Sequence, residues 1–388
     1  MNELSRRSFF KLGASAALGM ALINFTGLGS VALAKGTAPQ NLKFKPLPLD
    51  KLPDARGAAQ SSTLVQRSLN YIKASVNKIQ NSGLRAKTMN LIEDSRPTFM
   101  QMYPTATDVT NVYNKLADAG LVKTDKISPE QLFPPTKAFK AGIKQPPDFL
   151  CAPGSGYSSH HAYPGGLCTH VASNISITEG IVNTYKNIFG YDVDNDIALS
   201  GQALHDLAKP WVFQWNKDGS SLPEYTIAGT GAHHILSLTE ALYRGMPGEE
   251  IAAQACAHNH PGSPKDEEVV VGYLKAAAII AQKDPIKSEI LDKTGDKIPT
   301  PHHQEGYIVH LGDHDWVLSV DAAQQMVKAL KEIAQKDYNF SDSDLNGAKF
   351  NNFRNYIGSQ VSFMLLHNLL AQNGMNDLRR LVSQIVTK

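Results

Sequence analysis

Histidines gather in the middle of this chain, at a spacing that could bind metal ions. Eight of the 13 histidines in the 388-residue sequence fall between positions 160 and 260. One of them, His205, is followed directly by Asp206 and, four residues on, by Lys209. Neutral imidazole is the commonest nitrogen ligand of divalent metals, and a carboxylate can bridge two ions. The pattern therefore predicts a metal site assembled from several helices.

The His-Asp pair also determines how its side chains would be presented. Neighbouring residues on a helix point about 100° apart, so the His205 imidazole and the Asp206 carboxylate can face one cavity. Lys209 would lie on the helix face of His205 and could hold an anionic oxygen. A single histidine is usually an ordinary core or surface residue, whereas this whole set favours a site.

The ordered motifs resemble the HD-domain superfamily of metal-dependent phosphohydrolases. The run His-x-x-Pro-Gly-Gly-Leu-x-x-His spans 161–170, and after the His-Asp pair come His-Ile at 234–235 and His-x-His-x-Gly at 258–262. The Pro-Gly-Gly-Leu version is most similar to members related to 3′→5′ exoribonucleases and to relaxase-associated HD domains. Ala208 replaces the glycine usual in His-Asp-x-Gly-Lys. The resemblance covers about residues 146–290 and implies a helical bundle around one or two divalent ions.

The family pattern implies a ligand set with alternatives at its histidine pairs. His233 is the alternative to His234, which is preferred because its His-Ile step fits the family helix better. His260 is the alternative to His258. The implied metal ligands are His170, His205, Asp206, His234, His258 and Asp284.

The distal aspartate has a rival within a polar run. Asp284 closes the helical pattern of 269–283, where the family usually has Ala-Asp and this chain has Gln-Lys-Asp. Asp313 is the alternative, in the run from His302 to Asp315. That run could form a second metal site, bring ligands to the first, or lead as a polar segment into a helix, which is the commonest meaning.

The resemblance implies metal-assisted hydrolysis of a phosphomonoester or phosphodiester in a small phosphorylated molecule or nucleotide. One or two ions of Mn²⁺, Fe²⁺, Co²⁺, Ni²⁺ or Zn²⁺ would activate water. Asp206 would ligate or bridge the ions, while Lys209, with His161 or His260, would stabilise charge on the phosphoryl oxygens. Two other classes stay open: a di-iron oxygenase with the same ligands, and a metal-stabilised binding module without catalytic activity.

Helices must position these residues, and apolar residues at helical spacing predict an all-α chain. An HD helical-bundle core would carry additional N- and C-terminal helices. The segment 211–230 predicts a loop or small hairpin, whose aromatic residues could line a substrate entrance or pack as a lid. Predicted helices cover about 58–93, 107–121, 167–188, 197–209, 231–244, 248–258 and 268–283, with two or three more after 317.

The N-terminus resembles a twin-arginine export signal. Arg6 and Arg7 are followed by two phenylalanines, Lys11, an apolar stretch over 12–31 and an Ala-x-Ala cleavage motif. An uncleaved membrane anchor is the alternative, because the stretch approaches the length of a membrane span. We predict a signal peptide over 1–34, export through the twin-arginine machinery, and a periplasmic or other extracytoplasmic location.

Composition limits the partners and the covalent chemistry. The chain has 38 basic and 36 acidic residues, and without residues 1–34 it has 35 of each. This balance disfavours long nucleic acid as a partner and favours a small substrate. The cysteines are too few for a disulfide framework and are expected in the core beside the site: Cys151, Cys168 and Cys256.

The predicted domain organisation follows from the position of the motifs. Without its predicted signal the chain keeps 354 residues, enough for one large domain with additions. The predicted HD core at 146–290 is preceded by a helical region at 35–145 and followed by a helical extension at 291–388.

Overall fold

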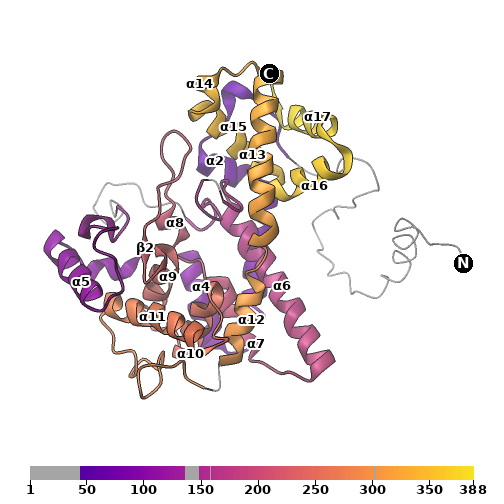
Figure 1. The fold of residues 1–388 in the computed structure, drawn as a ribbon. Coiled ribbons are helices and arrows are strands. Elements are labelled where there is room, and N and C mark those ends of the chain that lie inside the picture. Colours follow the sequence, from indigo (N-terminus) through magenta and orange to yellow (C-terminus); the bar gives the residue numbers. More distant parts are fainter. Residues whose placement is uncertain (1–43, 136–147, 158, 301–302) are drawn as a thin grey trace, which may run out of the picture. The chain divides into compact units, whose positions relative to one another are not determined.

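The computed structural model describes residues 44–135, 148–157, 159–300 and 303–388, which are coloured in Figure 1. Helices dominate these residues, and the strands among them are two residues long, which confirms the all-α prediction. The predicted signal peptide lies outside the described residues. Two short strand pairs occur: parallel β1 (Leu47–Pro48) with β4 (Val386–Thr387), and antiparallel β2 (Thr226–Ile227) with β3 (Thr230–Gly231).

Polar caps divide the predicted helix over 58–93 into three helices. The Ser62 side chain accepts the N–H of Val65, and the Asn81 side chain accepts the N–H of Gly83, so each residue begins a new helix. The predicted helix over 107–121 corresponds to α5. The bounds are α2 (Ala55–Ser61), α3 (Thr63–Val76), α4 (Ser82–Glu93) and α5 (Ala106–Asp118).

Helix α6 (Gly166–Phe189) begins where the Pro-Gly-Gly run permits very close backbone packing. Gly165 has a φ of +81°, and a Cβ at Gly166 would lie 1.8 Å from the carbonyl oxygen of His161. Glycine alone tolerates such an approach without a shift of the chain. The first turn of α6 is therefore held against the preceding loop, and the helix buries Leu167, Val171 and Ile175.

Helix α7 (Asn195–Leu204) ends just before the His-Asp pair, although the prediction continued it to Lys209. Pro210 has no backbone N–H, so it cannot donate to the carbonyl of Asp206 four residues earlier. Instead, Lys209 N donates to that carbonyl at 3.0 Å in a tight turn. The short helix α8 (Lys209–Val212) follows. The His-Asp pair therefore lies in the turn between two helices.

The next helices pack together around the histidines. Helix α9 packs along α11, and α10 lies against α7 and α9. The predicted helices over 231–244, 248–258 and 268–283 correspond to these, but the second ends early because the chain tightens into a 3-10 turn. The bounds are α9 (Ala232–Tyr243), α10 (Gly248–Ala255), the turn η5 (Cys256–His258) and α11 (Pro264–Ala281).

The C-terminal helices pack directly onto the central ones. Helix α12 contacts α6, α7 and α10, and α15 contacts α2 and α3. Residues 44–388 form one compact unit, and its predicted division at 145/146 and 290/291 stays a prediction. The bounds are α12 (His303–Gly312), α13 (Trp316–Tyr338), α14 (Asp342–Leu345), α15 (Ala348–Val361), α16 (Phe363–Asn373) and α17 (Met375–Ile385).

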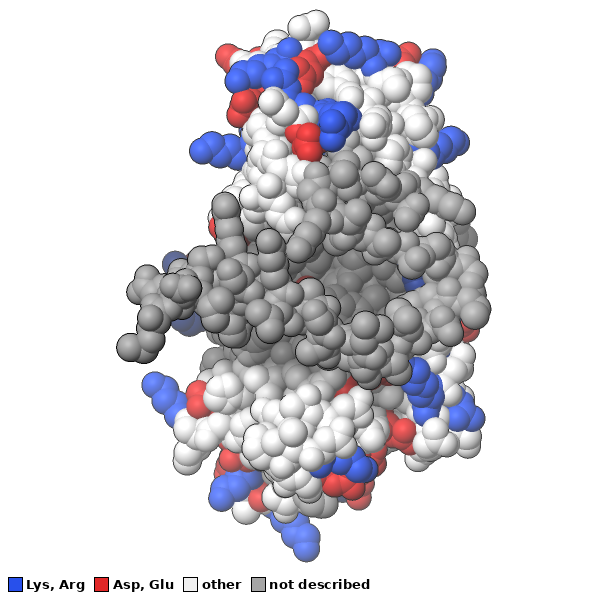
Figure 2. All heavy atoms as spheres, turned by 90° about the vertical axis from the view of Figure 1, so that its right-hand side faces the viewer, with Lys and Arg blue, Asp and Glu red and all other residues white. Residues whose placement is uncertain are grey.

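The cysteines of the described chain lie in its interior, and charges of both signs lie on its surface. Cys151, Cys168 and Cys256 are buried and form no disulfide, as predicted for core residues. On the part of the face in Figure 2 that the grey residues leave visible, Lys and Arg lie among Asp and Glu. None of the described helices is both long and apolar enough to cross a membrane.

Candidate metal centre

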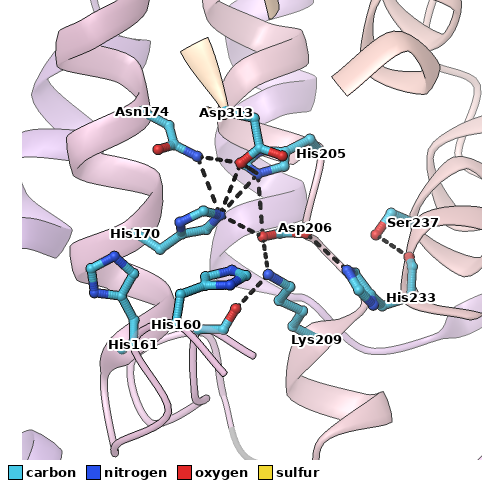
Figure 3. Close-up of polar contacts among 12 residues, drawn as sticks. His160, His161, His170, Asn174, His205, Asp206, Lys209, His233, Ser237 and Asp313 are labelled. Atoms are coloured by element: carbon cyan, nitrogen blue, oxygen red, sulfur yellow. Dashed lines mark hydrogen bonds and ion pairs between the residues drawn. The ribbon is translucent and has the colours of Figure 1, made fainter. Parts of the chain in front are cut away.

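Five segments that are distant in sequence bring histidine and aspartate side chains to one place. Figure 3 labels His170, His205, Asp206, His233 and Asp313 among them. Their potential ligand atoms form groups in which all atoms lie within 4.8 Å of one another. The contributors are His170 one turn into α6, His205 and Asp206 after α7, His233 and His234 at the start of α9, His258 in η5, and Asp313 after α12.

His170, His205 and Asp313 form the first group. Asp313 Oδ1 lies 3.2 Å from His170 Nε2 and 3.3 Å from His205 Nε2, and the two nitrogens are 3.3 Å apart. Asn174 holds the carboxylate by donating from Nδ2 to Oδ1 at 2.7 Å. Two imidazoles and a carboxylate directed at one point suit a divalent transition metal.

Asp206 stands between this first group and a second one, which it forms with His233, His234 and His258. Its Oδ2 lies 3.0 Å from His170 Nε2 and 3.2 Å from His205 Nε2. Its Oδ1 lies 3.3 Å from His233 Nε2 and 3.7 Å from His258 Nε2. Each oxygen of one carboxylate therefore faces a different pair of imidazoles, which is the arrangement that a carboxylate bridging two ions requires.

Fixed acceptors hold the ring nitrogens that face away from the centre. His205 Nδ1 lies 2.7 Å from the carbonyl oxygen of Gln202, and His233 Nδ1 lies 2.5 Å from Glu224 Oε1. An acceptor at Nδ1 places the ring proton there and leaves the Nε2 lone pair free to coordinate. Both imidazoles are therefore oriented as metal ligands.

The Asp206 carboxylate is buried and ionised. Its side chain has 0% exposure, and neither oxygen accepts a well-directed hydrogen bond. Burial alone would raise the pKa of Asp206, but His205 and Lys209 outweigh burial and hold this pKa well below its ordinary value. A buried anion requires compensating positive charge, so the donor set fits a divalent ion.

The imidazoles differ in their affinity for protons. Burial lowers the pKa of His205, but Asp206 and Asp313 outweigh burial and raise it to about 9. Burial lowers the pKa of His258 to about 3. His258 is therefore neutral at pH 7 and ready to coordinate, whereas an ion in the first group would take the place of the proton on His205.

Lys209 reaches the centre from the turn after α7. Its side chain is 1% exposed, its ammonium contacts Asp206 Oδ2, and it donates to the carbonyl oxygen of Gly154. The structure places Lys209 beside Asp206, after a turn and not on the continuous helix face of His205 that the sequence predicted. Its buried positive charge can stabilise negative charge beside Asp206.

A third group borders the first and contains His161, His170 and Asp315. His161 Nε2 lies 3.0 Å from Asp315 Oδ2, and His170 Nδ1 lies 3.3 Å from Asp315 Oδ1. The predicted His161 is thus at the edge of the centre. Sequence reasoning missed Asp315 as a neighbour of His170, although the Asp-x-Asp spacing at 313–315 is a signal that could have found it.

The predicted distal ligand Asp284 lies outside this centre. After α11, Gln282 adopts a left-handed φ of 52° and ends the helix. Asp284 is exposed and accepts the N–H groups of Ile286 and Lys287 at 2.9 and 3.1 Å. This placement corrects the prediction, because the rival Asp313 takes that place.

Packing explains why Asp313 replaces Asp284. Helix α12 lies against α6, α7 and α10, so its C-terminal end meets the helix ends that carry His170 and His205. The polar run that ends at Asp315 leads into α13, as the preferred interpretation expected, and it also brings Asp313 to the first group of potential ligands. His302, where that run begins, lies outside the described residues.

Both candidates of the first histidine pair reach the second group. His233, which the sequence argument ranked second, is the one whose Nε2 faces Asp206. The ring of His234 stacks on that of His258, with centroids 3.2 Å apart, and its Nδ1 contacts Thr230 Oγ1. The structure therefore adds His233 to the predicted set and keeps His234 within it.

Of the second histidine pair, the structure brings only His258 to the described centre. Its Nε2 lies 3.3 Å from Asp313 Oδ2, so this ring contacts both groups. His260 instead lies beside His310, with ring centroids 4.9 Å apart, and stacks on Tyr307. The catalytic role predicted for His260 is therefore not supported by its position.

Comparison with known proteins adds a partial similarity to an enzyme. The chain is 29% identical over 115 residues to a dihydroneopterin 2′,3′-cyclic phosphate phosphodiesterase of Methanocaldococcus jannaschii. The match covers 30% of this chain and 45% of the relative, so it spans less than half of that protein. No family profile and no solved structure matches the sequence. The chain is thus similar in part to a phosphodiesterase and holds a His/Asp cluster that could bind metal.

Proposed function

We propose that this chain is a divalent-metal-dependent phosphohydrolase of the HD superfamily. It would cleave a phosphomonoester or phosphodiester in a small phosphorylated molecule. The observation that carries the proposal is the buried carboxylate of Asp206, whose two oxygens face two groups of imidazoles. The proposed ligands are His170, His205, Asp206 and Asp313 for one ion, and Asp206, His233, His234 and His258 for the other.

The chemistry divides between the ions and the chain. Bound ions would polarise a phosphoryl oxygen and lower the pKa of water toward neutrality. Lys209, held against Asp206 and the Gly154 carbonyl, would stabilise negative charge that develops on the phosphoryl oxygens. His161, held by Asp315, supplies a further polar group at the edge of the centre.

A groove beside the centre offers room for the organic part of a substrate. It has a volume of about 530 Å³ and is lined partly by Tyr157, Phe213 and Glu224. The Phe213 ring lies 5.5 Å from that of His233, so the groove adjoins the second group. The relative is named for a cyclic phosphodiester of a small heterocycle, and we propose small cyclic phosphodiesters as the first substrates to test.

Metal content and hydrolysis together test this function. The full chain and an Asp206→Ala variant are purified, analysed for bound metals, and assayed with bis(p-nitrophenyl) phosphate and a nucleoside 2′,3′-cyclic phosphate under added Mn²⁺ or Co²⁺. We expect one or two metal equivalents and hydrolysis in the wild type, and loss of both in the variant. Protein that takes up no metal would contradict the proposal. Oxygen consumption without phosphoester hydrolysis would instead favour the oxygenase.

We also propose export by the twin-arginine route, on the basis of the motif at Arg6 and Arg7 and the Ala-x-Ala site that follows. Cell fractionation tests it with the Arg6→Lys, Arg7→Lys double variant. We expect the wild type outside the cytoplasm in a shortened form and the variant inside it at full length. Equal distribution of the two proteins would refute the export proposal and leave the enzymatic one intact.

A further inference from the structure

Glu224 lies behind His233, on the side of the ring away from Asp206. Its Oε1 accepts the backbone N–H of His233 at 2.9 Å and lies 2.5 Å from the ring Nδ1. Because the carboxylate keeps the ring proton on Nδ1, the Nε2 lone pair of His233 is presented to Asp206 Oδ1, 3.3 Å away. One side chain thus determines both the orientation and the tautomer of this imidazole.

The local fold builds this contact from backbone pairing. Strands β2 and β3 pair Thr226 with Gly231, and Ala232 N donates to the Tyr225 carbonyl at 2.9 Å. The residues before β2 therefore lie beside the start of α9, which carries His233. A Cβ at Gly231 would lie 2.7 Å from Glu224 Oε2, so the absent side chain leaves the space that the carboxylate occupies.

Different residues hold the imidazoles of the first and the second group. In the first group, the Gln202 carbonyl holds His205, and Asp315 lies beside His170. Glu224 meets the centre through His233, which belongs to the second group. A substitution of Glu224 should therefore lower the metal affinity of the second group more than that of the first.

We propose that Glu224 is a positioning residue that prepares His233 to bind the ion of the second group. This inference rests on the proposed metal centre. An outer-shell carboxylate that orients a histidine raises its basicity, and its loss typically lowers metal affinity roughly 10–100-fold. We expect this loss of affinity at the second group, while the site formed by His170, His205 and Asp313 keeps its affinity for metal.

A helix cap is the structural alternative. Glu224 accepts an N–H from the first turn of α9, and such N–H groups need partners outside the helix. A cap alone would lower the stability of the fold but leave the metal affinity of the folded protein unchanged. Metal affinity and thermal stability therefore have to be measured on the same variants.

Zn²⁺ titration by calorimetry of the metal-depleted full chain separates these roles. We expect Glu224→Ala to lower the Zn²⁺ affinity of one site by roughly 10–100-fold. Glu224→Gln should lower this affinity less, because an amide oxygen still accepts the ring N–H. In a His233→Ala background, Glu224→Ala should not lower Zn²⁺ affinity further, because Glu224 acts on the metal only through the His233 ring. Asp218→Asn is the matched control, because Asp218 precedes Glu224 in the same segment but pairs with Ser220.

Several outcomes would overturn the inference. These are unchanged Zn²⁺ affinity in both Glu224 variants despite lower thermal stability, or a further loss when Glu224→Ala is added to His233→Ala. The Glu224→Gln variant keeps the test decisive if the alanine variant fails to fold. Wild-type protein that binds no Zn²⁺ would overturn the proposed function and this inference together. Wild type that binds ions as tightly as its Glu224 variants would overturn this inference alone.

Discussion

Charge compensation governs the centre at the scale of residues. Burial raises the pKa of Asp313, but His205 and His170 outweigh it and hold this pKa well below its ordinary value. Asp206 is ionised for the same reason, with Lys209 beside it. Two buried carboxylates so close together repel each other unless cations or protonated imidazoles lie between them. A divalent ion would supply that charge and leave the imidazoles neutral.

The two rival aspartates give a matched pair for mutation. We expect Asp313→Asn to lower metal affinity by more than the roughly 10–100-fold typical of an outer-shell partner, because a charged ligand becomes a neutral amide. Asp284→Asn should leave affinity unchanged, since Asp284 is exposed and bonded to its own turn. Zn²⁺ titration of both variants measures this. Equal affinities in the two variants would remove Asp313 from the ligand set.

At the scale of elements, the contact between α7 and α10 places the His-Asp pair. Gln254 Nε2 donates to the carbonyl oxygen of Leu204 at 2.8 Å, at the end of α7. Glu250 is fully buried in the same contact and accepts from Ser200 Oγ at 3.1 Å, while its Oε2 has no partner. Burial raises the pKa of Glu250 to about 8, against the opposing effect of Ser200. Glu250 is therefore largely protonated at pH 7.

This carboxyl predicts a pH dependence of stability. As pH rises above the ordinary pKa of 4.5, the unfolded chain releases this proton while the folded chain keeps it until about pH 8. The unfolded state then binds fewer protons, so the stability contributed by Glu250 falls across this interval and is lowest above pH 8. Glu250→Gln should remove the loss and raise the free energy of unfolding at pH 8 relative to the wild type. Each unit of pKa shift corresponds to about 1.36 kcal/mol.

Chemical denaturation between pH 5 and pH 9 measures this effect. The control is Glu268→Gln, the same substitution at an exposed position of α11. The difference between Glu250→Gln and the wild type should grow as pH rises, whereas the difference for Glu268→Gln should stay near zero. Parallel pH profiles for the wild type and Glu250→Gln would show that Glu250 is not protonated in the folded protein.

At the scale of the whole molecule, the C-terminal helices support the loop that leads into the site. Arg354 of α15 has 0% exposure. It donates to the carbonyl oxygen of Tyr157 at 2.9 Å and to that of Ala162, and its guanidinium lies 4.2 Å from the centre of the Tyr157 ring. These contacts hold the chain on both sides of His161, directly before α6. The extension after residue 290 therefore helps to position the centre.

Arg354→Met should destabilise the fold and loosen this loop. The buried carbonyl of Ala162 and the partly buried carbonyl of Tyr157 would lose their donor, and an unsatisfied buried group costs about 1–3 kcal/mol. Thermal unfolding and hydrogen exchange of residues 159–163 measure the two effects. Arg379→Met is the control, because Arg379 pairs with Asp337 at the surface, where ion pairs contribute little. Equal losses in both variants would mean that Arg354 has no special role in holding the loop.

The sequence by itself determined the features that depend on local spacing. Helical periodicity predicted the all-α chain. Near neighbours in the motifs, such as His205 with Asp206, stay together in any compact arrangement of their helices. The resemblance to the HD superfamily, and not local spacing, added His170 and His258 to this pair in one predicted centre.

Only the tertiary structure decided which distant residues complete the centre. Asp284 and Asp313 both follow helices, but α12 packs against α6 and α7, whereas Asp284 is exposed after the end of α11. His233 rather than His234 faces Asp206 because the β2–β3 pairing brings Glu224 behind its ring. Such choices depend on helix packing and on backbone pairing between segments. Local spacing does not encode them, because the same pattern is compatible with several packings.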